Sequence, residues 1–268
     1  MNTFHRRGSL RGGGWEAVVD SELLDHAGLR IAELGDSLEL AAGLERIVVP
    51  LAGSFSVEHE GVETVLAGRA SVFDGPTDVL YLSCDAAAVI HGSGRVAVCE
   101  SPTAEAHPSR YLAAAEIPVE ARGAGASLRQ VRNFGTTGTL DAARLIACEV
   151  ITPAGNWSSY PPHKHDVALP GTESELEEIY YFEATGGPDG ADPFGVFFAD
   201  DLATTVHSGD LALVAAGYHG PAGAAPGYDL YYLNVMAGPG RREWLITDDP
   251  SHAWVRETWT QPGKGEDR

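Results

Sequence analysis

Two histidines one residue apart are the first feature of this 268-residue sequence that could do chemistry. His163 and His165 lie in the segment SSYPPHKHD, directly after two prolines that are unsuited to a helix interior. In an extended segment, residues two positions apart point to the same side, so both imidazoles face one way and Lys164 the other. Converging neutral imidazoles can bind one divalent metal ion. By itself such a pair is more typical of surface or hydrogen-bonded histidines, so the prediction of a metal site needs further ligands.

Glu178 and His219, further along the chain, are the additional candidate ligands. Glu178 lies in the strand-like segment SELEEIYYF, where alternation places Glu178, Tyr180 and Phe182 on one face. A carboxylate that points into an apolar barrel is costly unless it is paired or bound to a metal. His219 follows another apolar strand, at the glycine-bounded turn GYHG. Together with the two histidines, these residues predict a site of three nitrogens and one oxygen, which leaves positions open on Zn, Mn, Fe or Ni for a substrate.

The elements that position these residues are predicted to be strands. Short apolar stretches such as RIVVPLAG, DVLYLSCD and LALVAAG recur along the whole chain, separated by turns rich in its 32 glycines and 16 prolines. This pattern is typical of sandwiches and barrels and not of alternating strands and helices. The sequence therefore predicts an all-β protein.

The chain is predicted to contain two domains of similar fold. Both halves have similar numbers of strand-like stretches, and a polar stretch rich in small residues lies between them, around residues 116–131. We place the domains at 1–125 and 126–268. The candidate ligands all fall in the second domain, and the first contains no HxH pattern, so we expect the first barrel to be structural and without metal.

Composition excludes several classes of partner. The formal net charge is −20, from 38 acidic and 18 basic residues, which argues against binding to nucleic acid or to anionic membrane surfaces. No apolar run approaches the roughly 20 residues that span a bilayer, and the N-terminus lacks the apolar core of a secretory signal. The three cysteines show no CxxC spacing. We therefore expect a soluble, cytoplasmic protein.

Several motifs resemble those of the cupin superfamily, a family of small β-barrels or jelly rolls. SSYPPHKHD, LEEIYYF, GYH and PGYDLYYLNVMAGP are similar to the 5-deoxy-glucuronate isomerases of myo-inositol catabolism, which are two-cupin proteins related to the 4-deoxy-5-keto-uronate isomerases of pectin breakdown. The resemblance covers most of residues 130–260. This sequence differs from the usual cupin pattern in two ways. The gap between the HxH pair and Glu178 is longer and contains DVALPGTESELE, and Ala215 stands where proline is common.

The resemblance implies a fold, a ligand set and an activity. The fold is a bicupin of two β-barrels, and the metal ligands are His163, His165, Glu178 and His219. The activity is a metal-dependent aldose–ketose isomerisation, an intramolecular oxidoreduction that converts 5-deoxy-glucuronate to 2-deoxy-5-keto-gluconate. The partner is then a small sugar acid. No GxGxxG phosphate loop follows a strand, so no nucleotide cofactor is implied.

Other residues of the site are less determined by the sequence. Tyr180 shares the face of Glu178 and is the candidate catalytic residue, although a stripe of tyrosines more often lines a core. The substrate carboxylate needs a cation, for which Arg144, Arg241 and Arg242 are available in the second half. The acidic residues Asp166, Glu173, Glu175 and Glu177 are expected to form a solvated loop. We also expect a homodimer, because barrel edges often pair between subunits.

Two alternatives stay open at this stage. The same four ligands could hold iron in a cupin dioxygenase, because one fold and ligand set supports several chemistries. The protein could also be a non-enzymatic, sugar-binding bicupin with a vestigial metal site. The presence of four candidate ligands counts against the latter, since a vestigial site is expected to lose some of them.

Overall fold

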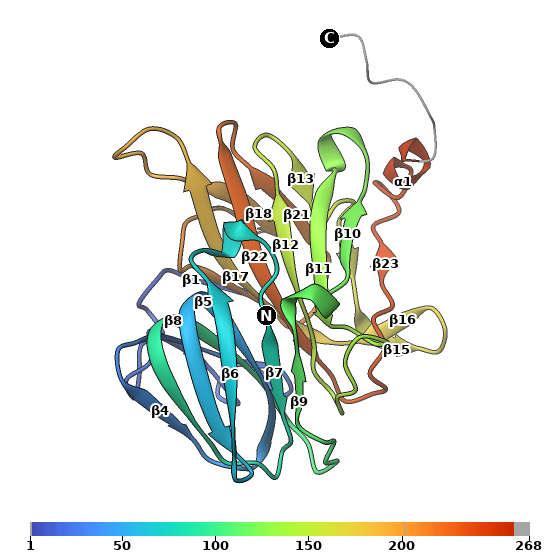
Figure 1. Ribbon diagram of the computed structural model, residues 1–268. Helices are drawn as coiled ribbons and strands as arrows, with labels where there is room; N and C mark the ends of the chain where they lie inside the picture. The colour runs from blue at the N-terminus through green and yellow to red at the C-terminus, as the bar shows by residue number, and fades with distance from the viewer. Residues whose placement is uncertain (1, 201, 260–268) are drawn as a thin grey trace.

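Strands make up almost all of the regular structure in the computed structural model, which describes residues 2–200 and 202–259 (Figure 1). The helical elements of this part of the chain are single turns: η1 (Val72–Asp74), η2 (Ala114–Glu116), η3 (Gly125–Ser127) and α1 (Val255–Thr258). The prediction of an all-β protein is therefore confirmed. Among the described residues, no helix has the length and apolar character needed to cross a membrane.

The N-terminal half forms one antiparallel sheet, drawn in blue to green in Figure 1. Its main path, in spatial order, is β2 (Ala17–Val19), β3 (Gly28–Leu34), β8 (Ala88–Pro102), β5 (Leu44–His59), β7 (Val79–Leu82) and β9 (Arg110–Leu112). Two further strands, β4 (Ser37–Leu40) and β6 (Val62–Arg69), pair with β8 and β5. The long strands β5 and β8 bend so that the sheet wraps around its own core.

The C-terminal half contains two larger sheets that pack face to face. One has the order β1 (Thr3–His5), β20 (Leu211–Val214), β17 (Glu177–Gly186), β22 (Tyr228–Ala237), β12 (Ile146–Thr152), β11 (Arg129–Gly135) and β10 (Val119–Arg122). The other has the order β19 (Leu202–Val206), β18 (Gly195–Ala199), β21 (His219–Ala224), β14 (His163–Lys164) and β23 (Thr247–Asp248), with β13 (Trp157–Ser158) also on β21. The hairpin of β15 (Asp166–Leu169) and β16 (Glu173–Glu175) lies beside them.

Segments assigned to the first domain also complete the C-terminal sheet. Strand β1 adds to one of its edges by pairing with β20, and β10 adds to the other by pairing with β11. The division of the chain into 1–125 and 126–268 stays a prediction. It separates most strands of the two barrels, but β1 and β10 precede residue 126 and belong to the C-terminal sheet.

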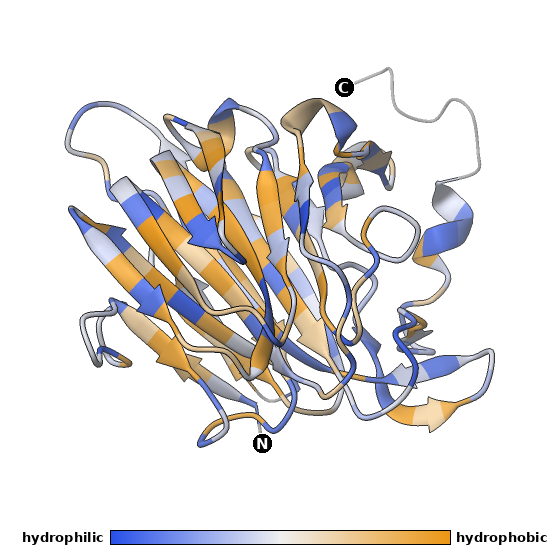
Figure 2. Ribbon diagram, turned by 60° about the horizontal axis from the view of Figure 1, so that its bottom comes forward, coloured by the Kyte–Doolittle hydropathy of each residue, from blue (hydrophilic) through white to orange (hydrophobic). Residues whose placement is uncertain are grey.

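The three larger of the four apolar clusters among the described residues correspond to this layout. One lies inside the N-terminal barrel and one between the two C-terminal sheets. The third joins the barrels, because side chains from β3 and β5 pack there against side chains from β17 and β22. The seven-stranded sheet is therefore buried on both faces, and hydrophobic residues run through its middle in Figure 2.

Burial on both faces explains the uninterrupted run of apolar and aromatic residues from Ile179 to Phe182 in β17 and the largely apolar sequence of β22. In β17, Tyr180 and Phe182 enter the core of the C-terminal barrel, while Ile179 and Tyr181 enter the core between the barrels. This confirms the predicted alternation in EEIYYF. A strand with one solvated face would instead alternate apolar and polar residues.

Buried polar contacts also hold the two barrels together. The carboxylate of Glu45, which is 0% exposed, accepts hydrogen bonds from the backbone N–H groups of Ala143, Arg144 and Leu145 at 2.6–2.8 Å and from the hydroxyl of Tyr81 at 2.8 Å. Further inter-barrel pairs join Arg69 to Glu149 and Arg95 to Glu183. The relative position of the barrels is thus fixed by both apolar and charged contacts.

Candidate metal centre

Four buried side chains meet at one end of the C-terminal barrel. His163 comes from β14, His165 from the residue after it, Glu178 from β17 and His219 from the first position of β21. Their candidate ligand atoms all lie within 4.8 Å of one another. The structure thus brings together all four residues that the sequence singled out as metal ligands.

Strand pairing sets the positions of the histidines. His163 lies directly opposite His219 in the register of β14 and β21, and their ring centroids are 4.6 Å apart. The ring of His165 lies 4.8 Å from that of His219. Glu178 reaches the group from the facing sheet. The site therefore spans the two sheets of the barrel and is supported by rigid elements.

Backbone carbonyls determine which ring nitrogens face inward. The Nδ1 atoms of the three histidines lie close to the carbonyl oxygens of Pro161, Leu176 and Gly217, at 3.2, 3.0 and 3.2 Å in chain order. A carbonyl oxygen can only accept a hydrogen bond, so each Nδ1 carries a proton, and each Nε2 atom offers a lone pair to a metal whenever its ring is neutral. Hydrogen bonds of this kind orient metal-binding histidines in proteins.

The carboxylate of Glu178 lies against these lone pairs. Its Oε2 atom is 3.0 Å from Nε2 of His165 and 2.9 Å from Nε2 of His219. The second contact is close but does not have hydrogen-bond geometry, so the buried Nε2 atom of His219 has no hydrogen-bond partner. Acceptors that converge on one point suit a cation between them, and this observation shows that the four residues fit a metal ion.

The electrostatics of the group agree with that fit. Burial and the neighbouring His219 hold the pKa of His163 well below its usual value, so its imidazole is neutral at physiological pH. Burial alone would raise the pKa of Glu178, but the adjacent imidazoles of His165 and His219 outweigh it and lower that pKa, so the carboxylate is ionised. A neutral imidazole and an ionised carboxylate are the forms that bind metals.

Charged residues of the following hairpin tie the ligand segments together. Lys164 points away from the histidines, as predicted, and donates to the carboxylate of Glu173 at 2.9 Å. Asp166 pairs with the same lysine and accepts a hydrogen bond from the backbone N–H of Gly217, two residues before His219. The prediction of a solvated acidic loop is wrong for Glu173, which is 3% exposed. Its carboxylate is buried because it accepts hydrogen bonds from Lys164 and from backbone N–H groups of the hairpin.

A glycine next to His219 is required by the geometry of the turn. Gly220 has a positive φ of 85°, and a Cβ atom there would lie 2.0 Å from the carbonyl oxygen of Ser159. No other residue fits this position without moving the backbone. The glycine-bounded turn in the sequence therefore marks a close contact between two segments of the site.

A small cavity opens beside the four residues. His163, Glu178, Ser159, Tyr180 and Tyr232 all line it. The hydroxyl of Ser159 lies 3.3 Å from that of Tyr180 and 3.1 Å from that of Tyr232. Burial and the charge of Glu178 raise the pKa of Tyr180 well above its usual value, so its hydroxyl stays protonated at neutral pH.

The arginines suggested by the sequence lie outside this cavity. Arg144 and Arg242 donate to backbone carbonyls around Pro239 and Leu145, and the side chain of Arg241 is exposed. The cavity is lined instead by Arg122, Arg129 and Arg256, which precede or follow the recognised motifs. Nothing in their local sequence marks them, because only the pairing of β10 with β11 and the return of the C-terminal segment bring them to the site.

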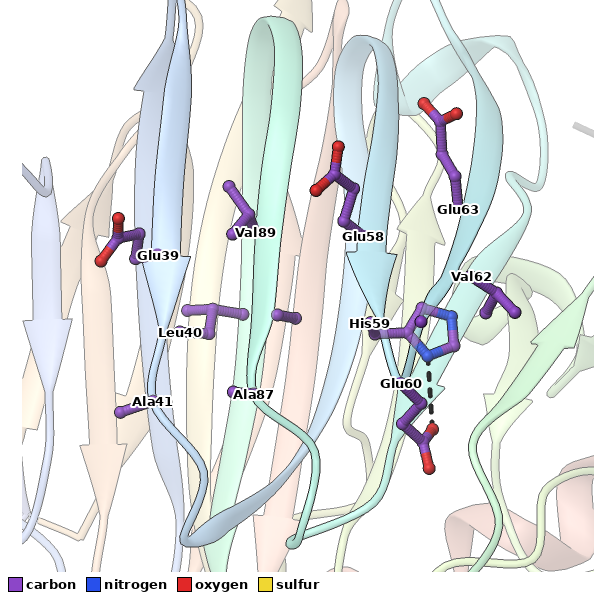
Figure 3. Close-up of a pocket in the computed structure, with 12 residues that line it drawn as sticks. Glu39, Leu40, Ala41, Glu58, His59, Glu60, Val62, Glu63, Ala87 and Val89 are labelled. Carbon is purple, nitrogen blue, oxygen red and sulfur yellow. Dashed lines mark hydrogen bonds and ion pairs between the residues drawn. The ribbon is translucent and has the colours of Figure 1, made fainter.

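A second, larger hollow lies in the N-terminal half, between the ends of β4, β5, β6 and β8 (Figure 3). It is rich in glutamate, but its one histidine, His59, contacts Thr64 and Glu60. Within residues 2–200 and 202–259, the group described above is the one cluster with metal-ligand geometry.

Comparisons with known proteins agree with the fold and the site. The model of the KduI/IolB family matches residues 11–255. This chain belongs to the KduI/IolB family. The 5-deoxy-glucuronate isomerase of Bacillus subtilis strain 168 is 36% identical over 253 residues, which cover 90% of this chain and 92% of that relative. The corresponding protein of Listeria monocytogenes is 38% identical over 246 residues, covering 87% and 89%.

Solved structures with a similar fold also match the chain. The crystal structure of an IolB-like protein from Salmonella typhimurium has a TM-score of 0.85 and 32% identity, covering 94% of this chain and 98% of the other. A variant of Bacillus subtilis oxalate decarboxylase has a TM-score of 0.56 at 11% identity, covering 86% and 74%. The second likeness concerns the fold alone, and both agree with the predicted bicupin.

Proposed function

We propose that this chain is a 5-deoxy-glucuronate isomerase, which converts the aldehyde 5-deoxy-glucuronate to the ketone 2-deoxy-5-keto-gluconate. The observation that carries the proposal is the buried group of three histidines and one glutamate, in a chain that shares 36% identity with a named isomerase over nine tenths of its length. The substrate is inferred from the named relatives, and the metal-assisted chemistry is inferred from the group of three histidines and one glutamate.

The reaction moves one proton between neighbouring carbons. A proton leaves the hydroxyl-bearing carbon next to the aldehyde and returns to the aldehyde carbon, while a hydroxyl proton moves between the two oxygens. Negative charge develops on both oxygens in between. A divalent cation, when bound, supplies Lewis-acid stabilisation of such charge, worth several kcal/mol.

The residues of the chain hold the components in place. The proposed metal ligands are His163, His165, Glu178 and His219, and of these His163 and Glu178 line the cavity. Because this ligand set suits Zn, Mn, Fe and Ni, we propose a divalent metal without choosing among them. The apolar core beneath the site keeps water away from the charged group.

Tyr180 is the proposed catalytic residue. It lines the same cavity as His163 and Glu178, and its protonated hydroxyl can donate to a substrate oxygen as charge develops there. It acts in this account as a hydrogen-bond and proton donor and not as the base that removes the carbon-bound proton.

Assembly and location are proposed on general grounds. The relatives are metabolic isomerases by name, and the chain has unpaired strand edges such as the outer edge of β10. We propose a cytoplasmic homodimer, which light scattering of the purified protein would test.

The function is tested by incubating purified protein with 5-deoxy-glucuronate and measuring the ketone product. Protein stripped of metal by a chelator should be inactive and should regain activity when one divalent metal is restored. Oxygen uptake in place of isomerisation would overturn the proposal in favour of a dioxygenase.

A further inference from the structure

Three arginines line the same cavity as His163 and Glu178. Arg122 ends β10, Arg129 begins β11 and Arg256 lies in α1. Arg122 and Arg129 lie opposite each other in the pairing of β10 with β11, whereas Arg256 is more than 100 residues further along the chain, and all three line the cavity with His163 and Glu178. A concentration of positive charge is unusual in a protein with a net charge of −20.

Two of the three arginines already have carboxylate partners. Arg122 binds Glu120 through Nε at 3.2 Å and Nη2 at 2.8 Å, and Arg256 binds Asp248. Arg129 differs from both. It is 7% exposed, its Nη1 atom donates to the carbonyl of Ser127 at 3.1 Å, and it forms no ion pair with any described carboxylate.

Burying a guanidinium without an anionic partner costs free energy of folding, so the burial of Arg129 needs an explanation. Its guanidinium carbon lies 5.3 Å from the centroid of the Trp259 ring, and the hydrogen bond of Nη1 to Ser127 is the only one that the guanidinium makes to the described residues. Burial and the charges of Arg122 and Arg256 lower the pKa of Arg129, which is the direction expected for a cation that lacks its anion. An incoming carboxylate would relieve this cost.

Two further donors in the same cavity also lack partners. The Nδ2 atom of Asn234 and the Nε1 atom of Trp244 are buried without a hydrogen-bond partner, and both residues line the cavity. Asn234 is 3% exposed and lies opposite Tyr180 in the register of β22 and β17. Unpaired donors of this kind suit a ligand rich in oxygen atoms.

We propose that Arg129 binds the carboxylate of the substrate and that Asn234 and Trp244 donate hydrogen bonds to its hydroxyl oxygens. This assignment rests on the proposed function, because it takes the ligand to be an open-chain sugar acid. In 5-deoxy-glucuronate the carboxylate is four bonds from the hydroxyl-bearing carbon that loses its proton. If the carboxylate of the substrate binds Arg129, the aldehyde end of the substrate is therefore free to reach the proposed metal ligands.

The subsite explains how the enzyme selects a uronic acid over a neutral sugar. A planar guanidinium can form two parallel hydrogen bonds with a carboxylate, which a primary alcohol at the same position cannot form. Because the carboxylate takes no part in the proton transfer, Arg129 contributes binding that is nearly equal in the ground state and in the transition state.

The test compares two substrates in two arginine variants. Arg129→Gln should lower kcat/KM for 5-deoxy-glucuronate by about 10- to 100-fold, mainly through KM, as expected for a lost charged hydrogen bond. It should leave kcat/KM for 5-deoxy-glucose, which has an alcohol in place of the carboxylate, within about 3-fold. Arg129→Lys should give an intermediate result, because it keeps the charge and loses the fork.

The control is Arg241→Gln, which removes an exposed arginine outside the cavity and should change neither substrate. Metal content should be unchanged in all three variants. Equal losses for both substrates in Arg129→Gln, or no loss for either, would overturn the assignment.

Binding separates this inference from the proposed function. If the wild-type protein does not isomerise 5-deoxy-glucuronate, the function fails and the subsite is tested by calorimetry with D-glucuronate and D-glucose. Tighter binding of D-glucuronate that disappears in Arg129→Gln would support a carboxylate subsite. No preference in the wild-type protein would overturn it.

Discussion

His163 and His219 lie directly opposite each other across the pair of β14 and β21, with ring centroids 4.6 Å apart. The pairing of two strands thus fixes two proposed ligands, while Glu178 reaches them from the facing sheet. Distances in the site depend on backbone hydrogen bonds and not on flexible loops. A site built on rigid elements is suited to hold a metal in one geometry.

Replacing His163 by alanine should remove the metal and leave the fold intact. The loss of one of four ligands should weaken metal binding by more than the roughly 10- to 100-fold typical of residues that only support a ligand. His91→Ala, in the N-terminal barrel, is the matched control and should keep its metal. Metal content by mass spectrometry and circular dichroism would measure both effects. Full metal content in His163→Ala would show that the ligand assignment is wrong.

Tyr180→Phe should slow the reaction without affecting metal content. The change removes the hydroxyl but keeps the ring that packs against Phe197 at 4.8 Å. We expect kcat to fall by about 10²- to 10⁴-fold, as for the loss of a proton donor. Tyr181→Phe, on the opposite face of the same strand, removes a hydroxyl that donates to Glu183 and should change stability more than kcat. Equal kcat values in the two variants would refute a catalytic Tyr180.

Glu45→Gln should destabilise the protein strongly although it lies far from the metal group. The substitution places an amide N–H₂ group among three backbone N–H donors that now share one carboxylate. Losing a buried hydrogen bond to a charged group costs about 1.5–3 kcal/mol in the free energy of unfolding. The exposed Glu39→Gln is the control and should change it by less than about 0.5 kcal/mol. Urea unfolding curves would measure both, and similar midpoints would contradict the account.

A fragment of residues 126–268 should be poorly soluble. Removing the first barrel exposes the apolar face of β17 and β22 and leaves Glu149 and Glu183 without Arg69 and Arg95. It also removes the edge strands β1 and β10. Expression of the fragment followed by light scattering would test this. A stable, active fragment would show that the core between the barrels is dispensable.

His107 should titrate above the usual range. Burial alone would lower its pKa, but hydrogen bonds to Asp141 and Glu105 outweigh it and raise that pKa. The folded state therefore binds this proton more tightly than the unfolded state, so the pair stabilises the protein below the unfolded pKa and loses its effect as pH rises through the folded value. NMR titration of the His107 ring should show a lower pKa in Asp141→Asn. An unchanged value would mean that Asp141 does not hold the proton.

The four candidate ligands could be identified from the sequence because side chains alternate between the two faces of a short strand. Extended backbone places His163 and His165 on one side, and Glu178 is a polar residue among apolar neighbours that point into a core. A cluster of histidine and glutamate side chains in an apolar environment then indicates a metal site. Each step depends on a few neighbouring positions.

The arginine subsite could not be predicted in this way. Arg129 and Arg256 are separated by most of the C-terminal barrel in the sequence, and neither lies in a motif. Their position depends on which strands form the edge of the sheet and where the chain returns after β23. The inter-barrel role of Glu45 is hidden for the same reason, since its partners are backbone groups about 100 residues away.

The central claim is that this protein moves a proton between two carbons of 5-deoxy-glucuronate. The most direct measurement is NMR of the reaction in deuterated water with protein of known metal content. The account predicts about one metal per chain, conversion to the ketone and deuterium at the former aldehyde carbon. Metal-loaded protein that leaves 5-deoxy-glucuronate unchanged would contradict it.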